Sequence, residues 1–182
     1  LKLKVVETDN DNPAADAQVA IVNNFMHSLF SEVDLYLNNK LISSSMDTYP
    51  YRAYLENLLT YGKEAKNTHL NACVVWKPDK PEKFNIIETD KAKDLNTVGF
   101  IARRDKIKDG RSLELMDRLH LDMWLQDKYL LNGVDIRLRL NRSSVAFHLM
   151  ADNGNYKTLI LEARLYVRRV EVLPKVGNDV TP

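Results

Sequence analysis

The sequence contains little cysteine and little glycine, and it has no long apolar run. Cys73 is the one cysteine among 182 residues, so no disulfide can form within the chain. The six glycines form neither a P-loop pattern nor a dinucleotide-binding fingerprint. No apolar stretch approaches the roughly 20 residues that cross a bilayer. These absences exclude a disulfide scaffold, argue against nucleotide chemistry and predict no membrane span.

An excess of charge of one sign is also missing. Lysine and arginine number 26 against 25 aspartate and glutamate residues, which leaves a net charge of +1. No overall attraction to nucleic acid or to an anionic membrane follows, so we predict no specific nucleic-acid site. Hydrophobic residues at 45% and charged residues at 28% are typical of a soluble globular domain. We expect one domain over residues 1–182, whose folding buries roughly 70% of the unfolded chain's surface.

Alternation of apolar and polar residues dominates the sequence and predicts β-strands. It is clearest at residues 134–141, where Leu131-Asn132-Gly133-Val134 predicts a tight turn into the strand. A second long strand is expected from Tyr156 to about Val172, with a β-bulge near Arg168 and Arg169, where the alternation changes phase.

Shorter patterns predict the remaining strands. Residues 33–37 and 40–43 are expected to form a hairpin around Asn38 and Asn39. Residues 3–7 are expected to form an edge strand, and residues 19–31 fit either a strand pair or a bent loop. We favour strands at 113–125 and 145–151, the second followed by a turn at 152–155. The expected fold is all-β, an antiparallel eight-stranded jelly-roll sandwich.

One helix is expected to interrupt the strands, near residues 50–61. Pro50 suits the first turn of a helix, and Gly62 follows as a stop. The apolar residues between them follow helical spacing and are Tyr51, Tyr54, Leu55, Leu58 and Leu59. We expect this helix to cover the core rather than to make an outward contact. The charged stretch 88–108 is expected to be an exposed inserted loop, with a short helix within it as an open alternative.

No pattern in the sequence predicts a catalytic, cofactor-binding or metal-binding site, or a cofactor. The four histidines are scattered along the sequence. His69 and Cys73 would lie close enough to share a metal ion only if they were on a helix, and the residues that follow Cys73 favour a strand instead. Basic residues around Arg103 and Arg104 are interleaved with acidic ones, which favours paired charges over an anion-binding patch. Asn141 begins a glycosylation triplet without other support. We therefore expect that the protein is not an enzyme.

Four blocks of the sequence resemble the major capsid proteins of Polinton (Maverick) elements and adintovirus-like viruses. They occur in the family's order and are residues 25–38 (FMHSLFSEVDLYLN), 48–56 (TYPYRAYLE), 59–62 (LTYG) and 126–136 (QDKYLLNGVDI). The resemblance extends from Val19 to about Leu173. Agreement of several long blocks in order makes it specific.

The resemblance implies a double jelly-roll capsid protein, similar in architecture to adenovirus hexon, of which this chain is the N-terminal jelly roll. It implies homotrimers that form pseudo-hexameric capsomers of an icosahedral shell, with minor capsid or penton proteins as further partners. It also implies a place in the virion and assembly in the host cell, with the nucleus as the expected compartment, and it brings no catalytic residues. The alternative is a jelly-roll module that binds a carbohydrate or another ligand through clustered aromatic side chains such as Tyr49, Tyr51, Tyr54 and Tyr61.

Overall fold

The structure is a computed structural model that describes residues 1–43, 46–73, 76–77, 79–82, 84, 86–87, 97–152 and 155–171. Three sequence predictions fall partly outside these residues. They are the middle of the turn at 152–155, the first part of the insertion at 88–108, and the last residue of the strand expected to end near Val172.

Among the described residues, eight strands form three small antiparallel sheets in place of one sandwich. The strand orders are β5-β1-β8, β2-β7 and β4-β3-β6. The strands are β1 (Lys2–Glu7), β2 (Val19–Ile21), β3 (Phe30–Leu37), β4 (Lys40–Leu41), β5 (Ser112–Glu114), β6 (Ile136–Arg142), β7 (Leu149–Ala151) and β8 (Tyr156–Glu162). The prediction of an all-β jelly-roll sandwich is wrong, because helices alternate with these sheets in a mixed α/β structure.

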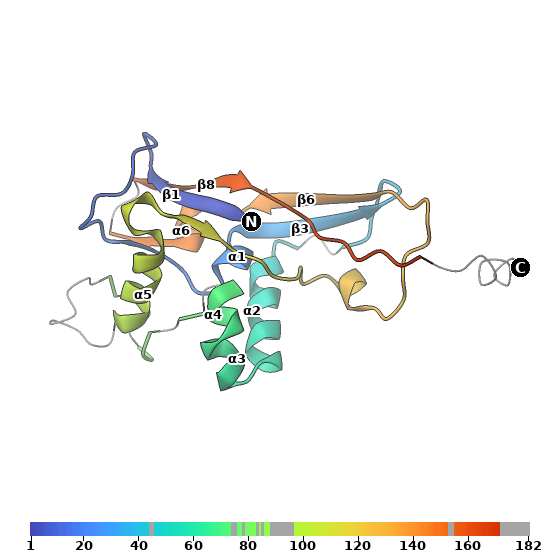
Figure 1. Ribbon diagram of the computed structural model, residues 1–182, viewed down its shortest axis with the longest axis horizontal. Helices are drawn as coiled ribbons and strands as arrows, with labels where there is room; N and C mark the ends of the chain where they lie inside the picture. The colour runs from blue at the N-terminus through green and yellow to red at the C-terminus, as the bar shows by residue number, and fades with distance from the viewer. Residues whose placement is uncertain are drawn as a thin grey trace, which may run out of the picture.

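The helices lie on one side of an elongated layer of strands (Figure 1). They are α1 (Phe25–Ser28), α2 (Tyr49–Thr60), α3 (Lys63–Asn67), α4 (His69–Cys73), α5 (Val98–Ile107) and α6 (Val145–His148), with short 3-10 helices η2 (Lys108–Gly110) and η3 (Asp122–Leu125). In Figure 1, β1 and β8 lie toward one end of the layer and β3 and β6 toward the other, with α2 to α5 below. No helix in the described ranges is both long enough and apolar enough to pass through a bilayer.

The hairpin predicted around Asn38 and Asn39 is confirmed. Leu37 pairs with Lys40, and the two asparagines between them have φ values of 47° and 66°. Both turn positions therefore have positive φ, which asparagine tolerates better than most residues. A signal contained in four consecutive residues was enough to predict this turn.

The other predicted hairpins are wrong because the strands pair with distant partners. The turn at Asn132 and Gly133 forms, with a φ of 85° at Gly133, but residues before it contain η3 rather than a strand, and β6 pairs with β3. The strand expected at 145–151 is divided between α6 and β7, and β7 pairs with β2. The strand favoured at 113–125 forms only at its start, as β5, and its last four residues form the 3-10 helix η3.

The long strand expected from Tyr156 is confirmed only as far as Glu162. It pairs with β1, which lies in the middle of its sheet rather than at the predicted edge, and the pairing ends where Lys2 lies opposite Glu162. The register shift in this pair lies between Ile160 and Glu162 rather than near Arg168 and Arg169. Residues 163–171 belong to no strand, so the predicted bulge does not form.

The described part of the predicted insertion is mostly helical and largely buried, so the short helix is confirmed and the exposed loop is wrong. It contains α5, where Phe100, Ile101 and Ile107 are buried and Arg103 is 1% exposed. The Arg103 guanidinium donates to the backbone oxygens of Ile21 and Lys77 and to Asp79, 2.9 Å away. Asp79 also accepts from the backbone N–H of Phe100. The basic cluster is therefore divided between a buried ion pair and Arg104, which donates to backbone oxygens of the 15–17 segment.

The predicted helix near residues 50–61 is confirmed as α2, and it covers the core as expected, but through a face other than the apolar one. The buried residues of α2 are Tyr49, Pro50, Ala53 and Asn57. All five predicted apolar positions are exposed, with Leu59 at 82%. The core instead contains residues of β1, β2, α1 and β3, such as Leu3, Ile21, Phe25 and Leu35.

Asp79→Ala is expected to lower the free energy of unfolding by about 3–5 kcal/mol, because it leaves the Arg103 charge buried without its partner. Urea denaturation followed by circular dichroism measures the change. Glu114→Ala is the control, since it removes an exposed ion pair with Lys2 and should cost at most about 1 kcal/mol. Equal costs for the two variants would contradict the structural role given to the Arg103–Asp79 pair.

His148 is expected to make stability depend on pH. Burial lowers the pKa of this imidazole to about 4, whereas it is 6.5 in the unfolded chain. Between these values the unfolded chain binds a proton that the folded chain does not, so the free energy of unfolding falls as pH decreases from 6.5 to 4. The shift corresponds to about 3 kcal/mol.

Urea denaturation at several pH values compares the wild type with His148→Gln, which should lose this part of the pH dependence. His69→Gln removes an exposed imidazole and should keep it. A His148→Gln curve parallel to that of the wild type would show that His148 binds protons equally in both states.

Candidate functional site

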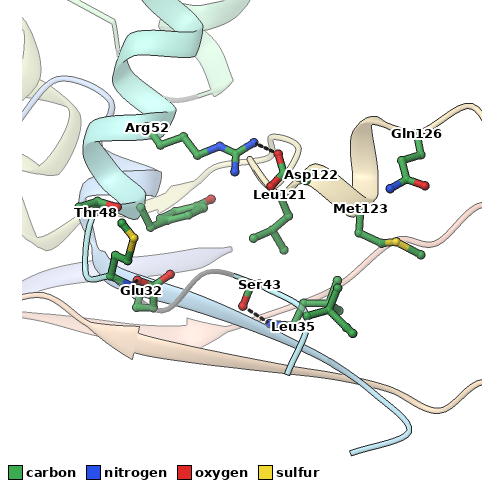
Figure 2. Close-up of a pocket in the computed structure, with 12 residues that line it drawn as sticks. Glu32, Leu35, Ser43, Thr48, Arg52, Leu121, Asp122, Met123 and Gln126 are labelled. Atoms are coloured by element: carbon green, nitrogen blue, oxygen red, sulfur yellow. Dashed lines mark hydrogen bonds and ion pairs between the residues drawn. The ribbon is translucent and has the colours of Figure 1, made fainter. Parts of the chain in front are cut away.

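A pocket of about 260 Å³ lies where β3, the start of α2 and the segment around η3 meet. Figure 2 shows Glu32 and Leu35 along β3, Arg52 from α2, and Asp122 and Met123 on the facing segment. The Arg52 guanidinium donates to Asp122 over 2.7 Å and so joins the two walls. The pocket is lined both by apolar side chains, such as Leu35 and Leu121, and by the charged groups of Glu32, Arg52 and Asp122.

Glu32 holds the chain that leads into α2. Its side chain is buried, and its carboxylate accepts hydrogen bonds from the backbone N–H groups of Met46, at 3.1 Å, and Asp47, at 2.6 Å. A carboxylate that accepts backbone N–H groups in this way fixes a loop against a strand. Glu32 thereby sets where α2 begins and where Tyr49 lies.

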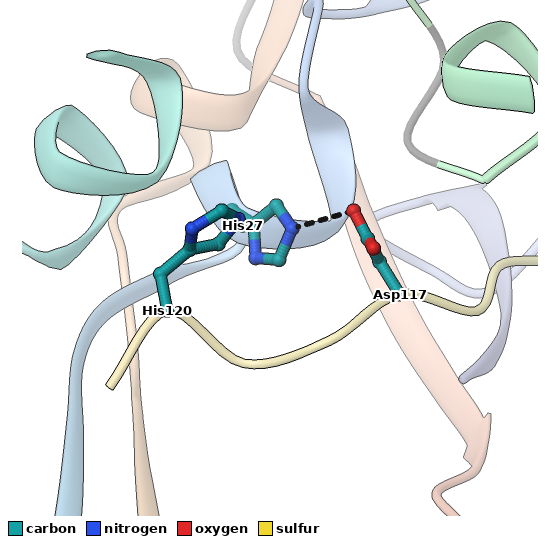
Figure 3. A group of neighbouring side chains, drawn as sticks. All are labelled: His27, Asp117 and His120. Atoms are coloured by element: carbon teal, nitrogen blue, oxygen red, sulfur yellow. Dashed lines mark hydrogen bonds and ion pairs between the residues drawn. The ribbon is translucent and has the colours of Figure 1, made fainter. Parts of the chain in front are cut away.

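Beside this pocket the fold brings together three side chains that offer metal-binding or proton-binding atoms: His27, Asp117 and His120. His27 belongs to α1, and the other two belong to the irregular segment between β5 and η3 (Figure 3). The donor atoms of the three side chains lie within 4.8 Å of one another. His27 Nε2 is 3.3 Å from Asp117 Oδ2, although the two residues are 90 positions apart.

Both imidazoles are fixed through their other ring nitrogen. His27 Nδ1 lies 2.9 Å from the Tyr49 hydroxyl, and His120 Nδ1 lies 2.5 Å from Glu56 Oε2. Both partners are on α2, which therefore orients the two rings. His27 and His120 are each 1% exposed, and their ring centroids are 4.7 Å apart in an edge-to-face arrangement.

Arg52 extends this network to the surface. It donates through Nε to Glu56 and through Nη2 to Asp122, each over 2.7 Å. The Asp122 side chain is largely exposed, whereas His120 at the other end is buried. Charges thus alternate in sign along Asp122, Arg52 and Glu56, and Glu56 contacts His120.

Burial and hydrogen bonding together set the charges of the cluster. Burial alone would raise the pKa of Asp117 and of Glu56. Hydrogen bonds outweigh it, so the pKa of each carboxyl group lies below its ordinary value: Asp117 is hydrogen-bonded to His27, and Glu56 to His120 and Arg52. Burial lowers the pKa of His120, and the hydrogen bond to Glu56 offsets this only in part. Two carboxylates and a neutral imidazole therefore coexist at neutral pH.

The sequence analysis predicted no site, and it missed this cluster because its members are far apart in the chain. One local signal was present, since Asp117 interrupts the apolar alternation of residues 113–125. The structure places that aspartate beside His27. His69 and Cys73 lie on the helix α4, whereas the strand favoured at positions 74–76 falls mostly outside the described residues. Among the described residues they belong to no group of three ligands.

Tyr49→Phe is expected to lower the free energy of unfolding by about 1–3 kcal/mol, because it leaves the buried Nδ1 of His27 without its hydroxyl partner. Urea denaturation at pH 7 measures the change. Tyr129→Phe is the matched control at an exposed tyrosine and should stay within about 0.5 kcal/mol of the wild type. Two indistinguishable variants would mean that the hydroxyl contributes nothing to stability.

Comparison with known proteins gives a relative in a nematode. The chain is similar to an uncharacterized protein of Caenorhabditis elegans, with 30% identity over 164 residues. The match covers 88% of this chain and 36% of the nematode protein, so the chain spans about a third of the relative's length. No known protein family and no solved structure matches the chain. The description of the relative names no activity, substrate or partner.

Proposed function

We propose that this chain is part of a structural capsid subunit, which acts by packing against other copies and not by catalysis. The four sequence blocks that resemble Polinton and adintovirus-like capsid proteins suggest it. The structural observation that carries it is the outward apolar face of α2. A surface of this kind is typical of a protein that binds other protein surfaces.

Contacts on the inner side of α2 account for this orientation. Tyr49, Ala53 and Asn57 follow one another at four-residue spacing and form the buried face of the helix. The Tyr49 hydroxyl binds His27, and the Asn57 side-chain amide donates to Asn24 over 3.1 Å. Because these polar contacts occupy the inner face, the leucines on the opposite face are left to solvent.

The outer face of α2 is a candidate for contact between subunits. The exposed side chains on it are Tyr51, Tyr54, Leu55, Leu58 and Leu59. Tyr54 stacks on Trp76, and Tyr51 contacts Phe147, so part of this surface is fixed in position by neighbouring aromatic rings. A preorganised apolar surface loses less side-chain entropy when it becomes buried in an interface.

The segment after β8 adds a second surface suited to assembly. Leu165, Tyr166, Val167 and Val170 are about half exposed or more, and the residues around them belong to no strand. An extended segment without a partner strand offers backbone N–H and C=O groups for pairing with another chain or segment. Natural monomers usually protect such segments, which makes this one consistent with a subunit.

In the proposed role, copies of the complete subunit form homotrimers. Each trimer is a pseudo-hexameric capsomer, and the capsomers build an icosahedral shell together with minor capsid or penton proteins. The proposed location is the virion, after assembly in the host cell. The match to about a third of a longer relative is compatible with a subunit that contains further sequence. The proposal does not include a jelly-roll sandwich for the present residues.

The ligand-binding alternative has weaker support. It needs aromatic side chains that converge on a cavity, but Tyr51, Tyr54 and Tyr61 contact other rings. Tyr49 does line the pocket, yet its hydroxyl is bound to His27. These tyrosines are used for packing.

The test is the mass of the full-length protein by light scattering over a concentration series, followed by electron microscopy of the larger species. We expect a trimer with a pseudo-hexagonal outline. In the same protein the double substitution Leu58→Glu with Leu59→Glu should shift mass toward the monomer, because it places charge in the proposed interface while leaving the core intact. Val98→Glu adds a charge at an exposed apolar position of α5 and is the control.

A full-length protein that stays monomeric at every concentration and salt condition would overturn the capsid role. If the double substitution leaves the trimers unchanged, the capsid role stands, but α2 is not part of the interface between subunits. Circular dichroism establishes that each variant is folded.

A further inference from the structure

His120 has a buried nitrogen that the described protein residues leave without a hydrogen bond. Its Nδ1 lies 2.5 Å from Glu56, and a carboxylate only accepts, so the proton of the neutral ring is on Nδ1. Nε2 then carries a lone pair, and this atom is buried without a partner. Buried polar atoms are nearly always satisfied, so an unpaired acceptor at this depth points to a partner from outside the protein, either a hydrogen-bond donor or a metal ion.

His27, a neighbour of His120, offers a second such nitrogen when metal binding displaces the proton that its Nε2 donates to Asp117. His27 also has one nitrogen, Nδ1, engaged by an outer partner, and its Nε2 faces the Asp117 carboxylate. Two imidazole nitrogens and one carboxylate oxygen are ligands that zinc and related divalent ions bind. The three side chains come from two segments of the chain, so their convergence is a product of the fold.

The distances suit a tetrahedral ion. Bond lengths of about 2.0–2.1 Å place neighbouring ligand atoms roughly 3.3 Å apart in such a site. His27 Nε2 and Asp117 Oδ2 are already 3.3 Å apart. All three ligand atoms lie within 4.8 Å of one another, so an approach of ~1.5 Å or less completes the triangle.

The outer partners match the arrangement found around protein-bound metals. A histidine ligand typically donates its second ring N–H to a carboxylate or another oxygen, which fixes the tautomer and the orientation of the ring. Glu56 has this role for His120, and the Tyr49 hydroxyl has it for His27. Both partners are on α2, so a metal at this point would be supported by three parts of the fold.

We propose that His27, His120 and Asp117 bind one divalent transition-metal ion, for which Zn²⁺ is the probe. The ion ties α1 to the segment between β5 and η3, and Tyr49 and Glu56 extend this tie to α2. Three protein ligands leave a fourth tetrahedral position for water. The proposal concerns the single chain and is independent of capsid assembly.

The first test is isothermal titration calorimetry of Zn²⁺ into the 182-residue chain, freed of metal with a chelator and checked for folding by circular dichroism. We expect one equivalent to bind, with a rise in Tm that the chelator reverses. Long-range nitrogen–proton NMR of the histidine rings then locates the ion. The Nε2 signals of His27 and His120 should shift, while those of His69 and His148 should not.

Variants separate this site from adventitious binding. Asp117→Asn keeps the shape of the side chain and should weaken Zn²⁺ binding by at least about 100-fold, and Glu56→Gln should weaken it about 10- to 100-fold. Two control variants, Asp127→Asn and His69→Gln, remove an exposed carboxylate and an exposed imidazole and should leave the affinity unchanged.

A folded wild-type chain that binds no Zn²⁺ would overturn the proposal. So would equal affinity in the wild type and Asp117→Asn, or NMR shifts confined to His69. If Asp117→Asn does not fold, the histidine NMR of the wild type decides, because it reports the ligands directly without a substitution.

Discussion

The hydrogen bond between Asn57 and Asn24 is the contact on which the helical side of this molecule depends. Both asparagines are about 1% exposed, and the bond joins the last turns of α2 to the residue before α1. Asn24 has a φ of 57°, and its carbonyl oxygen accepts the N–H groups of His27 and Ser28. One residue therefore starts the helix that presents His27 and also orients α2. With α2 turned this way, Tyr49 and Glu56 reach the histidines, and the leucines face outward.

Polar contacts of this kind explain why sequence analysis succeeded in some places and failed in others. The turn at Asn38 and Asn39 and the helix beginning near Pro50 depend on neighbouring residues, so local signals predicted both. The face of α2 could not be predicted, because apolar spacing alone indicates the stripe of leucines. The actual inner face is chosen by partners of Tyr49 and Asn57 that lie elsewhere in the chain.

Long-range pairing limited the prediction of the sheets and of the candidate site in the same way. The alternation in β6 is correct, with Leu138 opposite Leu35, but nothing near residue 136 indicates β3 as its partner. His27 and His120 likewise have no spacing that relates them. Sequence analysis places Arg103 in a charged loop, whereas in the structure it is buried and its guanidinium donates to Asp79 and to two backbone oxygens. In each case the deciding partner is distant in sequence.

The position of β1 between β5 and β8 has a consequence for how the chain acquires its fold. Lys2 and Leu3 pair with residues 113–114 on one side and with residues 160–162 on the other. At translation rates of about 5–20 residues per second, the first strand leaves the ribosome roughly 10–30 s before its last partner exists. The complete sheet therefore forms only after β8 has been synthesised, and contacts of such high sequence separation favour slow folding. Until then β5 is the only one of its two partner strands that β1 can pair with, and the other edge of β1 exposes unpaired backbone N–H and C=O groups.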